Sequence, residues 1–224
     1  MNTRFLKPAA LVLASLGAAA FSFGGWAVIT VDDLPRSLTI GQPVRIAFTV
    51  RQHGMKPLDG LKPTVVAASE NKAVSEVQTS ATANGPTGHY VANLVVPQRG
   101  RWTVTINSGF MASRITLSPI PAAAAGTRIE DHETPMELGR RLFIAKGCVT
   151  CHVHGAVEGY ESASIGPDLT PKRYQTDYLA KLLADPSSAR TPGQRWTMPN
   201  LELKTSEIAR LVAFINADRV VSAR

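Results

Sequence analysis

Only two of the 224 residues are cysteines, which excludes a disulfide-dense scaffold and a zinc site with four cysteine ligands. The sequence contains no Ser/His/Asp constellation, no glycine-rich loop for a phosphate, and no carboxylate pair with a reason for shifted pKa values. We find no internal repeat. These absences argue against hydrolases and nucleotide-dependent enzymes.

The composition is that of a globular protein. Apolar types make up 44% of the chain and charged types 18%, which excludes disorder, collagen and a coiled coil as descriptions of the whole. Lys and Arg number 24 against 17 Asp and Glu, and most of the excess lies before residue 127. The basic excess of this N-terminal segment favours an acidic partner or anionic lipid headgroups at long range. Because the basic residues do not cluster with aromatic ones, we predict no nucleic-acid partner.

The N-terminus has the features of an export signal. Arg4 and Lys7 precede an uncharged stretch over residues 8–31, and Ala18 and Ala20 fit the small-residue rule for signal peptidase. The alternative is an uncleaved anchor, since the uncharged stretch is long enough to span a bilayer. We therefore predict a signal peptide or membrane anchor over residues 1–27. Both readings place the rest of the chain in the periplasm or on the extracytoplasmic face of the cytoplasmic membrane.

Residues 28–118 have the pattern of β-strands. Apolar and polar residues alternate over 44–51 and 101–106, which indicates strands with one buried and one wet face. Further strands are expected at 26–31, 90–96 and 114–117, and Gly, Pro, Asn and Asp between them favour turns. Short strands at this spacing predict a small β-sandwich.

Residues 119–127 form a predicted linker, because prolines should stop any strand and the alanines have little to bury. After this segment, the spacing of the apolar residues changes to that of a helix. Thr134 and Glu137 form a capping box around a first helix that ends at Gly147. A second helix is expected over 177–184, and a third begins at Thr205 with one apolar stripe.

The Cys148-Val-Thr-Cys151-His152 motif is the attachment sequence for c-type haem. Two thiols on one turn can each add across a vinyl group at the same porphyrin edge, and the next residue, His152, can ligate the iron. A redox-active dithiol would require a βαβ context, whereas the flanking sequence is helical. A zinc site would require further ligands, and His154 is too close to His152 for the usual spacing. A plain disulfide remains the simplest alternative.

Met198 is the predicted sixth ligand. It lies between the attachment motif and the last helix, and its thioether would raise the reduction potential of the iron relative to a second imidazole. Pro199 follows it and stiffens the loop. The alternative role for Met198 is to fill the core. His132 is a weaker rival ligand, and His154 is too near His152 to reach the opposite haem face.

Residues 128–220 resemble a class I cytochrome c. The resemblance is carried by Cys148–His152, by Met198-Pro199 before the last helix, and by Gly139, Phe143, Gly147 and the segment Gly166-Pro167-Asp168-Leu169. It implies one covalent haem c, a Pro167 carbonyl that accepts a hydrogen bond from His152, and a Leu169 side chain packed on the haem. It also implies that Gly139 lets the terminal helix pack closely, with Phe143 and Phe214 beside the crossing. Trp196 and Tyr174 would reach the haem propionates or belong to the core.

The β region resembles small exported domains of the YtkA/FixH-like sort, through residues 26–31, 41–44 and 51–54. Such domains are linked loosely with oxidase assembly or copper handling. Four scattered residues are soft enough for Cu(I), namely His53, Met55, His89 and Met111. The resemblances together predict two domains, an N-terminal all-β immunoglobulin-like sandwich over 28–118 and a C-terminal all-α cytochrome c fold over 128–224.

Three functions follow as hypotheses. The first is an exported mono-haem electron carrier, not an enzyme, with His152 and Met198 as metal ligands and an oxidase, a dehydrogenase or a reaction centre as redox partner. Its β-sandwich would be a docking module. The second is a peroxidase or gas binder, which would require an open distal position. The third is a β-sandwich interaction or copper-handling module of a respiratory complex, with an accessory haem domain.

Overall fold

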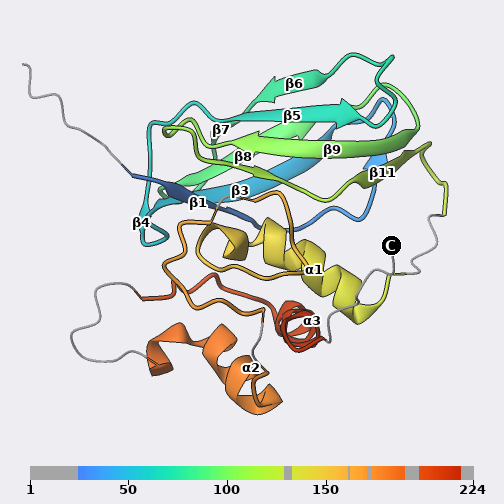
Figure 1. Ribbon diagram of the computed structural model, residues 1–224. Helices are drawn as coiled ribbons and strands as arrows, with labels where there is room; N and C mark the ends of the chain where they lie inside the picture. Colours follow the sequence, from blue (N-terminus) through green and yellow to red (C-terminus); the bar gives the residue numbers. More distant parts are fainter. Residues whose placement is uncertain (1–24, 129–132, 161, 171–172, 190–196, 218–224) are drawn as a thin grey trace, which may run out of the picture.

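A computed structural model describes residues 25–128, 133–160, 162–170, 173–189 and 197–217. The predicted export segment before residue 25, His132 and Trp196 lie outside these ranges. Within them, no helix is long and apolar enough to cross a membrane. The strands form the upper part of the molecule in Figure 1, and the helices lie below them.

Two sheets make up the β region. One has the order β1-β3-β8-β7, with β4 paired to β3, and the other has the order β2-β11-β9-β5-β6, with β10 paired to β9. Neighbouring strands are antiparallel, except that β2 and β11 are parallel. The bounds are β1 Ala27–Val31, β2 Leu38–Thr39, β3 Val44–Gln52, β4 Lys56–Pro57, β5 Thr64–Ser69, β6 Val77–Ser80, β7 Thr82–Ala83, β8 His89–Leu94, β9 Gly100–Asn107, β10 Arg114–Thr116 and β11 Ile120–Ala123.

The strand β1 differs from its neighbours because all five of its residues are buried. An ordinary strand at the surface of a sandwich buries every second residue, as β9 does over Trp102, Val104 and Ile106. In β1, one face points to the sandwich core. The other face is covered by the first helix, where the Thr30 hydroxyl approaches the Lys146 carbonyl.

Three α-helices follow: α1 Pro135–Ala145, α2 Thr176–Ala184 and α3 Thr205–Ile215. Short 3-10 turns occupy Cys148–Thr150 and Pro186–Ala189. The capping box at Thr134 is confirmed, because its hydroxyl accepts from the Glu137 N–H while the Glu137 carboxylate accepts from the Thr134 N–H. The positions expected for all three helices from apolar periodicity are confirmed to within a residue or two.

The crossing of α1 and α3 requires the glycine at position 139. A methyl group there would lie 2.0 Å from the Arg210 carbonyl oxygen and 2.6 Å from Cβ of Phe214. Phe143 and Phe214 pack beside the crossing with ring centroids 5.4 Å apart. The close approach expected of Gly139 is therefore confirmed.

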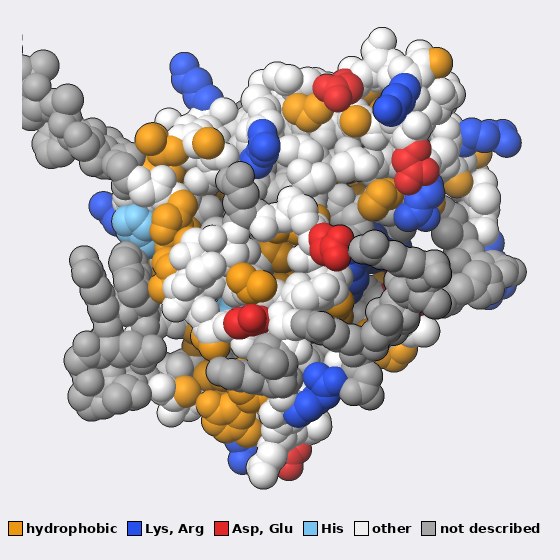
Figure 2. Space-filling view, in the orientation of Figure 1, with side chains coloured by type: hydrophobic (Ala, Val, Ile, Leu, Met, Phe, Trp, Pro, Cys, Tyr) orange, Lys and Arg blue, Asp and Glu red, His pale blue; other side chains and the backbone are white. Residues whose placement is uncertain are grey.

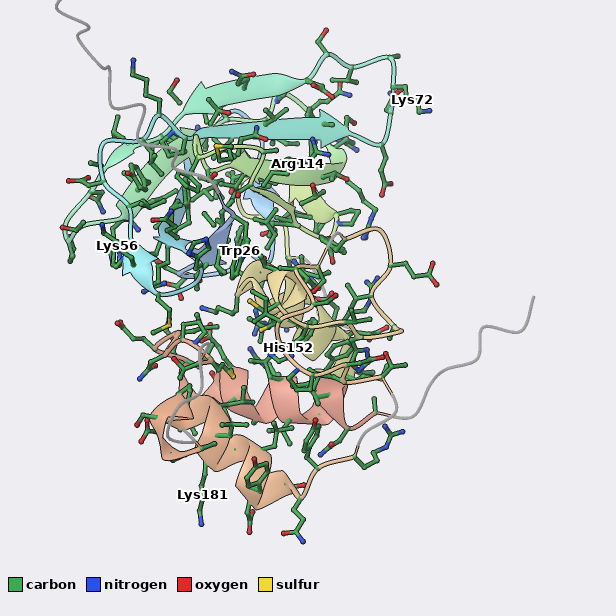
Figure 3. All side chains as sticks on the ribbon, turned by 60° about the vertical axis from the view of Figure 1, so that its left-hand side comes forward. Trp26, Lys56, Lys72, Arg114, His152 and Lys181 are labelled. Atoms are coloured by element: carbon green, nitrogen blue, oxygen red, sulfur yellow. The ribbon has the colours of Figure 1, made fainter. Side chains whose placement is uncertain are left out.

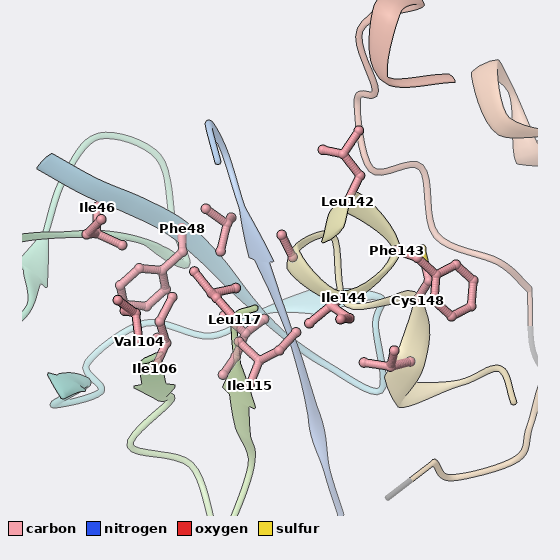
Figure 4. Close-up of a cluster of buried hydrophobic side chains, with 14 of the residues drawn as sticks. Ile46, Phe48, Val104, Ile106, Ile115, Leu117, Leu142, Phe143, Ile144 and Cys148 are labelled. Carbon is pink, nitrogen blue, oxygen red and sulfur yellow. The ribbon is translucent and has the colours of Figure 1, made fainter. Parts of the chain in front are cut away.

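The predicted fold class is wrong. The described residues form a mixed α/β structure, and the part after residue 133 is not an obvious all-α fold, because its described residues contain only three α-helices. Nor do the helices form a separate core. Buried side chains run without a break from Phe48 through Leu117 and Ile144 to Cys148, as Figure 4 shows. Helical periodicity identified each helix but carried no information on which surface α1 would cover.

The expectation that no strand forms in the predicted linker is also wrong. Strand β11 lies inside it and pairs with both β9 and β2. Ile120 and Ala122 are buried, so this short segment has the period of a half-buried strand despite Pro121. Pairing with the exposed edge of β9 outweighs the local effect of the proline, which removes a single N–H donor.

Candidate functional site: an apolar cavity around Cys148, Cys151 and His152

The attachment motif lies on the turn that follows α1. Gly147 ends the helix with a left-handed backbone (φ 78°), a conformation that glycine adopts without strain. The chain then tightens into a 3-10 turn over Cys148–Thr150, where the N–H groups of Cys151 and His152 both donate to the Cys148 carbonyl, at 3.1 and 2.9 Å. This short turn holds the two thiols and the imidazole on one piece of rigid backbone.

Both thiols are free; Cys148 is buried and Cys151 is half-buried. Burial raises the pKa of Cys148 to about 12, with the neighbouring Cys151 adding to the shift, and burial raises the pKa of Cys151 to about 11. A catalytic dithiol has a lowered pKa, because the thiolate is the reactive form. The raised pKa values therefore argue against a redox-active dithiol, and no disulfide joins the pair.

The imidazole of His152 is oriented by a backbone carbonyl. Its Nδ1–H donates to the Pro167 oxygen over 3.0 Å, which leaves Nε2 as the free ligand atom. Burial lowers the pKa of His152, and the hydrogen bond to Pro167 opposes that shift only in part. The ring is thus neutral near pH 7, as a metal ligand must be.

Gly166 gives this imidazole its space. A methyl group at position 166 would lie 2.3 to 2.8 Å from three ring atoms of His152, well inside contact distance. The glycine was part of the recognised segment, but its role was not predicted, because no local pattern relates residue 166 to a ring fourteen residues earlier.

A cavity of about 330 Å³ opens beside these groups. It brings together all six predicted site residues, namely Cys148, Cys151, His152, Pro167, Leu169 and Met198. Leu179 and Leu183 from α2 add apolar lining, and both are nearly fully buried. Figure 3 shows His152 beneath the β region, above α2 and α3.

The β region also lines this cavity, with residues that were not predicted as site residues. They are Trp26 just before β1, Val28 in β1, and His53 in the turn between β3 and β4. Sequence reasoning treated Trp26 as the start of a strand and His53 as a scattered copper donor. Nothing local indicates that either faces a site more than ninety residues further along the chain.

His154 and Tyr174 were the other candidate residues near the site, and the structure places both. His154 is buried against Phe214 and Phe143, with ring centroids 4.3 and 5.9 Å away, so its role is packing. Tyr174 lines the cavity, and its backbone is tied to Asn216 by two hydrogen bonds of 3.0 and 2.9 Å.

The copper donors lie in three separate segments: His53 and Met55 in the turn between β3 and β4, His89 at the start of β8, and Met111 in the turn before β10. His89 Nδ1 lies 3.3 Å from the Thr49 hydroxyl, His53 packs against Trp26, and Met111 is exposed in the turn before β10. Among the described residues, no group of three or more His, Cys, Asp or Glu side chains is placed to hold a metal ion.

The cavity fits a haem. It combines two unpaired thiols on one turn, a neutral imidazole with a free Nε2, a thioether from Met198, and apolar walls. This donor set matches covalent haem c with Met/His ligation, whereas zinc would require further nitrogen or sulfur ligands.

Comparison with known proteins agrees with this chemistry. Residues 136–217 match the family model for cytochrome c. No curated protein matches the sequence. Two of the solved structures that match are the ZirS C-terminal domain and a superoxide reductase (neelaredoxin) from Ignicoccus hospitalis. The ZirS domain has 13% sequence identity and a TM-score of 0.32, and the match covers 55% of this chain and 86% of that one. The superoxide reductase has 10% identity and a TM-score of 0.30, and the match covers 43% of this chain and 80% of that one. Residues 136–217 therefore have the sequence of a cytochrome c domain, and this match supports haem binding and electron transfer as the chemistry of this part of the chain.

Proposed function

We propose that the protein is an exported mono-haem cytochrome that carries single electrons between partner proteins, with His152 and Met198 as the two axial ligands. The observation that carries this proposal is the placement of Met198 in the same cavity as His152, whose Nδ1 is held by Pro167. Export is supported by Arg4, Lys7 and the uncharged stretch that follows, because c-type haem is attached beyond the cytoplasmic membrane.

The bound haem would supply one-electron exchange between Fe(II) and Fe(III). The residues of the chain control the conditions for that exchange. Cys148 and Cys151 would hold the porphyrin on the turn after α1, and the Pro167 carbonyl orients the His152 ring through a hydrogen bond. Met198 supplies a neutral, soft sulfur, which favours the reduced state. The apolar walls, with Leu169 among them, exclude water.

The presence of Met198 as a residue that would fill the sixth position is the reason to prefer electron transfer over catalysis. A peroxidase or gas binder requires an open or labile site, and a di-haem peroxidase requires two attachment motifs where this chain has one. The copper-handling alternative gains no support from the structure, because its four donors lie in three separate segments of the β region.

Redox proteins are the proposed partners, whether an oxidase, a dehydrogenase or a reaction centre. On the face shown in Figure 2, Lys and Arg side chains are dispersed among other residues and do not form a continuous basic patch, which supports a protein partner over a nucleic acid. We further propose that the β sandwich, with its likeness to YtkA/FixH-like domains, offers the docking surface. The N-terminal segment would direct export or tether the protein to the membrane.

The substitution Met198→Ala tests the axial assignment. Loss of a strong-field ligand should convert the ferric iron from low to high spin, read from the visible spectrum and by electron paramagnetic resonance. Met136→Leu is the matched control, since Met136 is partly buried in α1 and does not line the cavity. An unchanged spin state in Met198→Ala would disprove the ligation. His53→Asn in the Met198→Ala background excludes capture of the iron by that imidazole.

A further inference from the structure

The start of β1 and the β3–β4 turn form one wall of the haem cavity. Trp26 and His53 both line it, with ring centroids 5.4 Å apart in an edge-to-face arrangement. The His53 N–H donates to the Trp26 carbonyl over 3.0 Å, which ties the turn to the strand. His53 also adopts a left-handed backbone (φ 51°), which is uncommon for a residue other than glycine. Figure 3 shows Trp26 above the region that holds His152.

The same turn contacts both neighbours of Met198. A methyl group at Gly54 would lie 3.4 Å from Cγ of Pro199, so the turn packs directly on that proline. On the other side, the Thr197 hydroxyl donates to the Met55 sulfur over 3.8 Å. Residues on each side of Met198 are thus held by consecutive residues of a β-turn that lies more than 140 positions earlier.

The far end of the Met198 segment is also attached to the β region. Residues 197–204 have no regular secondary structure. Lys204 forms an ion pair with Asp33 in the loop after β1. Burial lowers the pKa of Arg51 in β3, and the charges of Glu202 and Asp32 oppose that shift, so the Glu202 carboxylate lies within the field of this strand.

We propose that the β sandwich is a structural part of the haem site: Trp26 and the turn of residues 53–55 close the cavity and brace the 197–204 segment, so that Met198 stays on the iron. This inference rests on the proposed ligation by Met198. An irregular loop exchanges between closed and open forms, and contacts made only in the closed form lower the open population. Trp26, Gly54 and Met55 are positioning residues, because they act through the loop rather than on the iron.

Binding of an added ligand to the iron measures directly how firmly Trp26 and residues 53–55 hold the 197–204 segment closed. Imidazole can bind the ferric iron only when the thioether is displaced, so its apparent affinity reports the open population. We expect Met55→Ala and Trp26→Ala, in the full holoprotein, to bind imidazole about 5- to 30-fold more tightly than wild type. The reduction potential should fall, because the thioether that favours Fe(II) is held less firmly. Trp26→Phe should restore most of the wild-type affinity.

Met111→Ala is the matched control for Met55→Ala. Both methionines are exposed in turns of the β region, but it is the Met55 sulfur that accepts from the Thr197 hydroxyl. Because Met55 is exposed, its truncation does not threaten the fold.

The outcomes separate the two proposals. If Met198→Ala leaves the spectrum unchanged, the ligation itself is wrong. If Met198→Ala changes the spin state while Met55→Ala and Trp26→Ala bind imidazole within about twofold of wild type, the ligation stands and the brace is refuted. Tighter binding in these two variants, with Met111→Ala unchanged, supports the brace.

Discussion

Lys146 joins the β region to the helices through a buried ion pair with Glu207 and a hydrogen bond to Asp32. Removal of its charge should lower the free energy of unfolding. Its ammonium donates to the Asp32 carbonyl at 2.7 Å and lies 2.9 Å from a carboxylate oxygen of Glu207. The two charged side chains are only 3% and 8% exposed. The other Glu207 oxygen accepts from the Lys204 N–H and caps α3.

The substitution Lys146→Met keeps most of the buried stem and removes the charge. It leaves Glu207 as an uncompensated buried carboxylate, a loss that costs about 3–5 kcal/mol of unfolding free energy. Adding Glu207→Gln removes that charge while an amide oxygen can still cap α3. The double variant should therefore recover about 1–3 kcal/mol, and the unpaired Asp32 carbonyl accounts for the remainder.

Urea unfolding of the holoprotein, followed by far-ultraviolet circular dichroism, measures both values. Lys181→Met is the control, because Lys181 is exposed on α2 and points away from the molecule in Figure 3, and it should change the free energy by less than about 0.5 kcal/mol. A loss below about 1 kcal/mol for Lys146→Met, or no recovery in the double variant, would refute the reasoning.

Three further predictions concern single residues. Gly166→Ala should disturb His152 and lower the yield of haem-loaded protein with a normal spectrum. Gly159→Ala strains its own left-handed backbone (φ 80°) but meets no neighbouring atom, so its spectrum should stay normal. Gly139→Ala should lower the free energy of unfolding by about 1–3 kcal/mol or more, measured by urea titration, because the added methyl clashes with α3. The Tyr90 hydroxyl donates to the Leu58 carbonyl over 2.8 Å, and burial raises the pKa of Tyr90. The contribution of this tyrosine to the free energy of unfolding is therefore complete below its unfolded pKa of 10.0, and it is lost as the pH rises through its higher folded pKa. Tyr90→Phe should therefore cost about 1–3 kcal/mol near neutral pH, and the difference from wild type should shrink in alkaline titrations; a constant difference would contradict this sign.

Local signals in the sequence were sufficient for the elements and for the chemistry of the attachment turn. The capping box at Thr134 and the apolar stripe after Thr205 located α1 and α3, because helix ends and faces depend on residues within a few positions. Cys148, Cys151 and His152 were found for the same reason, since their spacing is itself the motif.

The architecture could not be obtained in this way. That α1 covers β1, that Gly54 packs on Pro199, and that Gly166 makes room for His152 all depend on contacts between distant segments. A sequence can indicate that a segment is buried on both faces, as the mostly apolar strand β1 is, but a single sequence does not say which other segment covers it. The wrong separation into an all-β and an all-α domain has this origin.

The central claim is that one haem is covalently attached through Cys148 and Cys151, and intact mass spectrometry of the denatured protein tests it most directly. Protein from a host that performs this attachment should have the mass of the mature chain plus one haem, and acid–acetone extraction should leave the colour with the protein. Cys148→Ala/Cys151→Ala should have the mass of the bare chain. A bare-chain mass for the wild type, or haem released into the solvent, would contradict the account.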